Sequence, residues 1–131
     1  MKLIIIAILA CTSMSVSAEC WLVSNLKGHS AYNTDGYIFN RNGITNGIFQ
    51  VDITKNKADL RLVGDSLSGG GLQYIPVSPV SMVGFFTEGN KSTIETWAIT
   101  DDKKVMYSKV MSNPEALNST SSFVGDVIGK C

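Results

Sequence analysis

The sequence has 131 residues, with 11 basic side chains, 11 acidic side chains and a single histidine. The basic residues are scattered along the chain, and Lys103-Lys104 is the one adjacent pair. This distribution lacks the basic patch of a nucleic-acid-binding protein and the polybasic cluster that binds membrane surfaces. We therefore expect no nucleic-acid partner.

Residues 1–18 have the layout of a secretory signal peptide. Lys2 precedes an unbroken apolar run that ends at Cys11, and small residues lead to a cleavage point after Ala18. The apolar run is too short to cross a membrane, and no other segment of the chain is long and apolar enough to do so. An alternative is that Ile8-Leu9-Ala10-Cys11 is a lipobox, which would leave Cys11 as a lipidated N-terminus. The short run before Cys11 favours cleavage.

Cleavage would leave residues 19–131 as a single domain in the periplasm or outside the cell. Cys20 would then be the second residue and Cys131 the last. Because two cysteines in an oxidising compartment usually pair, we expect a disulfide that joins the two termini.

Strand patterns dominate the first half of the domain. A short strand is predicted at residues 37–40, and Asn42-Gly43 and Asn46-Gly47 are predicted turns. Phe49, Val51 and Ile53 alternate with polar residues, and a second alternating set follows the polar connection at 54–57. Residues 47–64 are therefore predicted to form a β-hairpin.

The second half continues the pattern. Strands are predicted at 72–77 and 80–86, with Pro76 and Pro79 marking a bend between them. Residues 92–99 and 104–111 are rich in β-branched and aromatic residues and predict a second hairpin. A helical turn is predicted at 113–118, where Pro114 would start it, and a last strand at 121–128.

These elements predict an all-β fold with about seven or eight short strands. Such a chain forms a single small antiparallel β-barrel or β-sandwich, and alternation alone does not distinguish the two.

Gly64-Asp65-Ser66-Leu67 resembles the first motif of the GDSL esterases, whose serine works with a downstream histidine. This chain has no histidine after Ser66, and only 65 residues follow it. A serine nucleophile needs a base within hydrogen-bond reach. We interpret the match as fortuitous and keep a serine hydrolase as a remote alternative.

Residues 68–74, Ser68-Gly69-Gly70-Gly71-Leu72-Gln73-Tyr74, resemble the Ser-Gly-x-x-x-x-Tyr element of bacterial c-type lysozyme inhibitors. Those proteins are small exported β-barrels in which this loop enters the lysozyme cleft. The resemblance implies that Ser68 is the inserted residue, that Gly69, Gly70 and Gly71 form the contact loop, and that Tyr74 braces it. The competing interpretation is a plain connection in which the glycines permit positive φ.

We expect neither an enzyme nor a metal or cofactor site, because His29 is the one histidine and both cysteines of the domain are assigned to the disulfide. The hypothesis is an exported, non-enzymatic binding protein, with a lysozyme-like enzyme as the specific target to test. The alternative is an envelope or extracellular interaction protein that recognises a surface protein or a glycan through exposed aromatics. That alternative requires exposed rings at Trp21 and Trp97, although most aromatics of a small β-domain are expected in its core.

Overall fold

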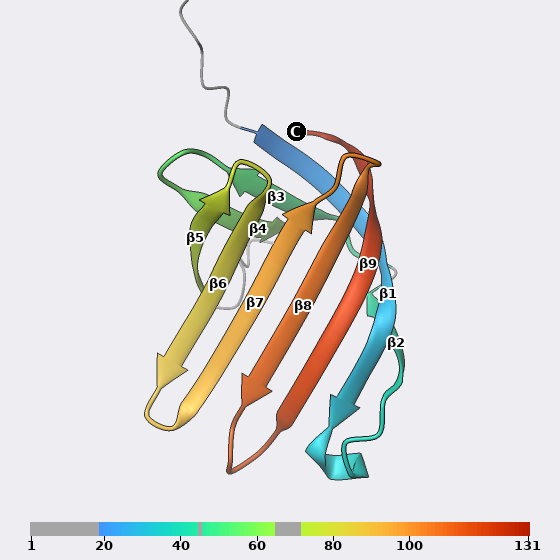
Figure 1. Cartoon of the computed structure of the whole chain (residues 1–131), viewed down its shortest axis with the longest axis vertical. Coiled ribbons are helices and arrows are strands. Elements are labelled where there is room, and N and C mark those ends of the chain that lie inside the picture. Colours follow the sequence, from blue (N-terminus) through green and yellow to red (C-terminus); the bar gives the residue numbers. More distant parts are fainter. Residues whose placement is uncertain (1–18, 45, 65–71) are drawn as a thin grey trace, which may run out of the picture.

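A computed structural model describes residues 19–44, 46–64 and 72–131. In these residues the chain forms a nine-stranded antiparallel sheet and one 3-10 turn (Figure 1). The elements are β1 (Glu19–Tyr32), η1 (Asn33–Asp35), β2 (Asn40–Ile44), β3 (Phe49–Ile53), β4 (Ala58–Leu62), β5 (Gln73–Ser78), β6 (Ser81–Glu88), β7 (Lys91–Ile99), β8 (Lys104–Ser112) and β9 (Asn118–Lys130).

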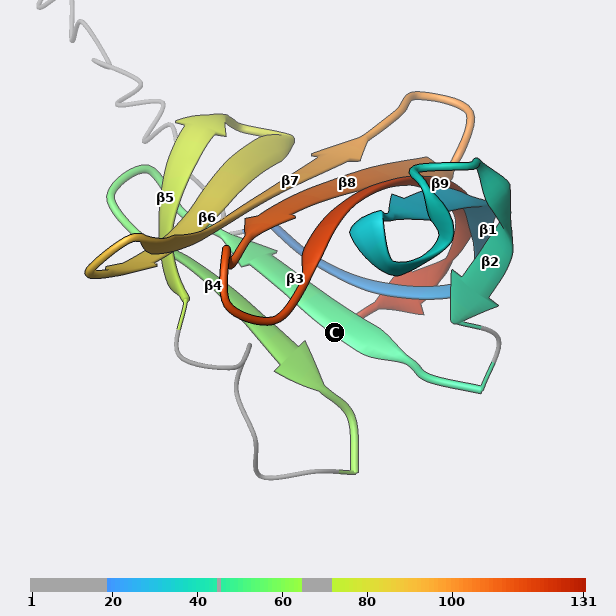
Figure 2. The same ribbon diagram turned by 90° about the horizontal axis from the view of Figure 1, so that it is seen from below.

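Eight of these strands follow one another round the sheet in the order β4-β3-β1-β9-β8-β7-β6-β5, and β2 adds to the edge of β1. The sheet curls until β4, at one end of the order, comes into contact with β5 at the other. Seen from below, β3 and β4 cross beneath the wall formed by β5 to β9 (Figure 2). The all-β prediction is therefore confirmed, and the architecture is a nearly closed barrel.

The long strand β1 and the last strand β9 hold the two halves of the barrel together. One edge of β1 pairs first with β3 and then with β2, while its other edge pairs with β9 along nearly its whole length. The predicted disulfide is confirmed: Cys20 is bonded to Cys131, and the amide of Cys131 donates to the Cys20 carbonyl at 3.2 Å. The two ends of the domain are therefore closed both covalently and by hydrogen bonding.

Both predicted hairpins are confirmed, and their turns are closed by threonine side chains. In the β3–β4 turn, Thr54 Oγ1 accepts a hydrogen bond from the Lys57 amide at 2.9 Å. In the β7–β8 turn, Thr100 Oγ1 accepts from the Lys104 amide at 3.0 Å, and Lys103 adopts a positive φ of 61°. These local bonds replace the ladder where each strand reverses.

The sequence did not predict β1, the longest strand. The pairing with β9 shifts register between Leu22 and Val23 and again between Ser24 and Lys27. Val23 and Ser24 are both buried although they are neighbours, and Asn25 has a φ of 58°. Because β-bulges break the two-residue period, alternation along this strand is hidden from a sequence pattern.

Three smaller predictions were wrong. The strand predicted at 37–40 lies instead at Asn40–Ile44, because Tyr37 leaves η1 with a φ of 61° and cannot extend. Asn42-Gly43 lies inside β2 and not in a turn. There the side-chain amide of Asn42 donates from Nδ2 to Ser30 Oγ at 3.1 Å. The helical turn predicted at 113–118 is absent: residues 113–117 form a turn in which the Ala116 backbone amide donates to the Asn113 carbonyl at 3.1 Å, and Asn118 begins β9.

The core lies between the wall of β6 to β9 and the strands β1, β3 and β4. Its buried side chains are Trp21, Val23, Leu26, Val51, Ile53, Leu60, Met82, Trp97, Val105, Tyr107 and Phe123. The described part of the chain contains no helix that is long and apolar enough to cross a membrane.

Candidate functional site

Among the described residues, Glu95 on β7 is the one whose carboxylate is buried in the barrel. Alternation along β7 turns Glu95 and Trp97 to the inside and Ile94 and Thr96 to the outside. Only 8% of the Glu95 side chain is exposed, so its charge must be compensated by neighbouring groups.

Strand register brings the partners of Glu95 from both sides. On the neighbouring strand β8, Lys109 lies opposite Glu95. On the other neighbour, β6, Gly84 lies opposite Glu95, and Gly84 in turn lies opposite Tyr74 of β5. A Cβ atom at Gly84 would lie 2.3 Å from a ring carbon of Tyr74. The missing side chain therefore lets the Tyr74 ring lie over β6 and reach Glu95 two strands away.

The Glu95 cluster consists of Tyr74, Glu95, Trp97, Tyr107 and Lys109. The Tyr74 hydroxyl donates to Oε2 at 2.6 Å, and the Tyr107 hydroxyl donates to Oε1 at 3.0 Å. The Trp97 indole N–H donates to Oε2 at 3.5 Å, and Lys109 Nζ lies 3.7 Å from Oε1. Each carboxylate oxygen thus faces two donors, which uses the acceptor capacity of the group.

The two phenols of the cluster are held in the neutral, hydrogen-bond-donating form. Burial raises the pKa of Tyr74 far above its ordinary value, and the hydrogen bond to Glu95 raises it further. Burial followed by the charge of Glu95 does the same to the pKa of Tyr107. A phenolate beside a buried carboxylate would place two like charges together, so both hydroxyls keep their protons.

A continuous series of aromatic rings packs beside the cluster. The centroids of Trp97 and Tyr107 are 4.2 Å apart, and the rings of Phe49 and Phe123 extend the series at 5.6 Å on either side. The series crosses from β3 to β9 and packs the two walls of the barrel together. It fixes the positions of Trp97 and Tyr107, which both donate to Glu95.

A cavity of about 390 Å³ adjoins the cluster, between β3–β4 and β7–β8. Its polar walls are Thr93, Glu95 and Lys109, and its other walls are apolar or aromatic. The remaining lining residues are Ile44, Phe49, Leu60, Leu62, Leu72, Trp97, Tyr107 and Met111. A smaller hollow of about 250 Å³ lies between the β3–β4 turn and the end of β5, and a larger, more open one of about 690 Å³ lies between β1 and β2, but no buried charge faces either. The candidate site is therefore the cavity beside Glu95.

The predicted contact residues Ser68, Gly69, Gly70 and Gly71, and also Ser66, lie outside the described residues. Tyr74 is described, and it points into the barrel towards Glu95. Leu72, two residues earlier, lines the cavity. Leu72 and Tyr74, at the described end of the segment that resembles a lysozyme-inhibitor loop, therefore lie beside the candidate site.

Sequence reasoning missed the Glu95 cluster, although one signal was present. The alternation in residues 92–99 places a glutamate on the same face as a tryptophan, which predicts a buried charge. Trp21 and Trp97 are 6% and 2% exposed. They cannot form an exposed aromatic platform, and the expectation that most aromatics belong to the core is confirmed for this pair.

Within the described ranges, no three His, Cys, Asp or Glu side chains lie close enough together to hold a metal ion. Comparisons with protein-family models, with curated proteins and with solved structures found no match to this chain.

Proposed function

We propose that this protein is an exported, non-enzymatic binding protein whose cavity takes a small amphiphile with an apolar body and a carboxylate head. The observation that carries the proposal is the cavity of about 390 Å³, whose walls are apolar or aromatic apart from Thr93, the already hydrogen-bonded Glu95 and one cationic side chain, Lys109. Ligand sites in proteins are typically concave, largely apolar and supplied with a few placed polar groups. The Cys20–Cys131 disulfide supports export, because such bonds persist in oxidising compartments.

Lys109 is the group that would receive the head of the ligand. Glu95 already accepts hydrogen bonds from Tyr74, Trp97 and Tyr107, and its negative charge does not favour a carboxylate head. An ammonium has three donors, and Lys109 directs one of them towards Glu95. About a third of its side chain is exposed, which leaves its remaining donors accessible from the cavity.

The volume sets the size of the ligand. A cavity of 390 Å³ corresponds to the space of about thirteen waters, or roughly a dozen non-hydrogen atoms. At about 0.5 kcal/mol per atom, which is within the range for small ligands, binding would contribute ~6 kcal/mol. The expected dissociation constant is on the order of 10–100 μM.

The test is a fluorescence titration, because Trp97 lines the cavity and reports on its contents. Medium-chain carboxylates are added to the oxidised protein, and the corresponding alcohols serve as uncharged ligands of equal length. We expect saturable changes in fluorescence with both series and tighter binding of the carboxylates. The variant Lys109→Met should remove this preference while leaving alcohol binding unchanged, because methionine keeps the apolar stem.

The matched control is Lys57→Met, which removes a lysine from the exposed β3–β4 turn. It should bind both series as the wild type does. Absence of saturable binding in either series would refute the cavity as a ligand site. Equal loss of both series in Lys109→Met would refute the assignment of the head group.

A second candidate function is inhibition of a c-type lysozyme by the loop that contains Ser68. It is favoured by the anchoring of Tyr74, which fixes the chain on the C-terminal side of that loop through Glu95. The protein is titrated into lysozyme while lysis of a cell-wall suspension is followed. Dose-dependent inhibition that Ser68→Ala abolishes, with the unfolding temperature unchanged, is the expected result. No inhibition at micromolar protein would eliminate this candidate.

A further inference from the structure

The side of strands β5 to β9 that points away from the core is uncharged and largely apolar, and we call this surface the outer face. It consists of the outward-pointing residues in three successive cross-strand rows, all within the described part of the chain and none of them charged. Its large exposed side chains are Ile75, Phe85, Ile94, Met106, Val110 and Val124, with 38% to 53% of each exposed. A soluble sheet with one free face normally places polar residues there.

The three rows have a simple order. The first row contains Phe85, Ile94 and Val110, and the third contains Ala98 and Met106. Between them lies a middle row that begins with Ile75 and Val83 and continues with the hydroxyls of Thr96, Ser108 and Ser122, the first two of which are hydrogen-bonded to each other. Over β7, β8 and β9, small hydroxyl groups therefore separate the first row from the third.

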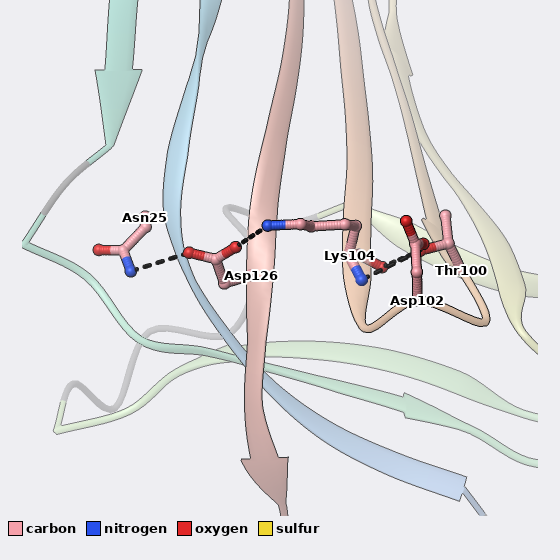
Figure 3. A network of polar contacts seen from close by, with 5 residues as sticks. All are labelled: Asn25, Thr100, Asp102, Lys104 and Asp126. Atoms are coloured by element: carbon pink, nitrogen blue, oxygen red, sulfur yellow. Dashed lines mark hydrogen bonds and ion pairs between the residues drawn. The ribbon is translucent and has the colours of Figure 1, made fainter.

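Charged and polar side chains flank this surface on two of its sides without entering it. At the end of β8 and β9 nearest the β7–β8 turn, Lys104 donates to Asp126 at 2.6 Å, and Asn25 donates to the same carboxylate at 3.2 Å (Figure 3). On the far side of β9, Lys27 and His29 of β1 continue the rows as exposed basic groups. The outer face is thus a largely apolar area with polar residues along two of its sides, as at the rim of protein interfaces.

We propose that the outer face is the interface of a homodimer in which two copies pack sheet against sheet. A two-fold axis along the middle row places that row against itself and the first row of each copy against the third row of the other. Phe85 then lies over the small Ser81, Ile94 lies over the small Ala98, and Val110 lies over Met106. Large side chains of one copy therefore meet small side chains of the other, and this self-complementarity in size is what a two-fold interface requires.

The dimensions of the outer face set the expected strength of the dimer. Five strands at about 4.8 Å and three rows at about 6.8 Å give roughly 24 by 20 Å, or roughly 480 Å² in projection. This value lies at the upper end of the apolar patches found on monomers and at the lower end of specific interfaces. The dimer should therefore be weak and reversible, with a dissociation constant on the order of 10–300 μM.

Sedimentation equilibrium over a range of protein concentrations tests the proposal. The protein is expressed from its complete coding sequence and purified in the oxidised form. We expect the average mass to rise towards twice that of the monomer, and the association to persist at high salt because no charge pair supports it. Val110→Glu should raise the dissociation constant at least about tenfold, since two buried charges would face the partner copy.

The matched control is Val63→Glu, which makes the same substitution beyond β4 at a residue with 51% exposure, against 50% for Val110. It should dimerise as the wild type does. Val110→Thr preserves the shape and β-branching of valine, and it should weaken the dimer even if Val110→Glu fails to fold. A wild type that stays monomeric at the highest concentration would overturn the proposal. So would equal weakening by the substitutions at Val63 and Val110.

Discussion

The Glu95 cluster predicts a measurable coupling between Glu95 and Tyr74. The perturbation is a double-mutant cycle of Tyr74→Phe and Glu95→Gln, which separates their interaction from the individual effects of each residue. Tyr74→Phe keeps the ring over Gly84 and removes only the hydroxyl that donates to Glu95 at 2.6 Å. Glu95→Gln keeps the shape of the side chain and removes its charge.

The size of the coupling follows from the nature of the hydrogen bond. A bond to a charged group contributes about 1.5–3 kcal/mol, and a bond between neutral groups contributes about 0.5–1.5 kcal/mol. Removing the Tyr74 hydroxyl should therefore destabilise the wild type more than it destabilises Glu95→Gln. The expected coupling energy is about 1–1.5 kcal/mol, a sizeable part of the ~5–15 kcal/mol that typically stabilises a domain.

Urea unfolding followed by tryptophan fluorescence measures all four proteins. With a denaturant slope of about 1–1.5 kcal/mol/M, the coupling corresponds to a shift of roughly 1 M in the midpoint. Tyr32→Phe is the control, because the Tyr32 hydroxyl accepts from Asn42 and has no contact with Glu95. Its effect should add to that of Glu95→Gln. Additivity within about 0.3–0.5 kcal/mol in the Tyr74 cycle would refute a charge-assisted bond at Glu95.

Three further outcomes are expected. Replacing Cys20 and Cys131 by serine should lower the free energy of unfolding by about 4–5 kcal/mol, because the bond closes a loop across 111 residues, and guanidinium titration measures it. Tyr74 and Tyr107 have raised pKa values, so the unfolded chain releases their protons first. The free energy of unfolding obtained from urea titrations should therefore fall above pH ~10, by up to about 1.4 kcal/mol per pH unit for each phenol. Gly84→Ala should lower the free energy of unfolding by about 1–3 kcal/mol, because the new methyl group clashes with the Tyr74 ring. Thermal unfolding should show a smaller loss when the same substitution is made in Tyr74→Leu.

The local sequence pattern was sufficient to predict the strands that pair with the next strand along the chain. The β3–β4 and β7–β8 hairpins keep a two-residue period and end in polar turns, so alternation and turn residues locate them. The disulfide followed from the positions of Cys20 and Cys131 in a chain whose first residues predict export. These features depend on neighbouring residues or on a predicted signal peptide, and both are patterns within one sequence.

Long-range features could not be predicted in the same way. The bulges of β1 arise from its pairing with β9, about a hundred residues away, and they disrupt the period that would have revealed the strand. The Glu95 cluster joins Tyr74, Glu95 and Lys109 across four strands, and this order depends on strand register and on the absence of a side chain at Gly84. Choosing a barrel over a sandwich likewise required the order of strands.

The two proposed surfaces lie on opposite faces of the same strands, which explains an unusual property of their sequences. In β6 and β8 apolar residues occupy both alternating positions: Met82 and Tyr107 face the core, while Val83 and Met106 face outwards. Strands that are covered on both faces typically have such continuous apolar runs. Because alternation separates the faces completely, substitutions at Val110 leave the lining of the cavity intact, and those at Lys109 leave the outer face intact. Ligand binding and dimerisation can therefore be tested independently in the same barrel wall.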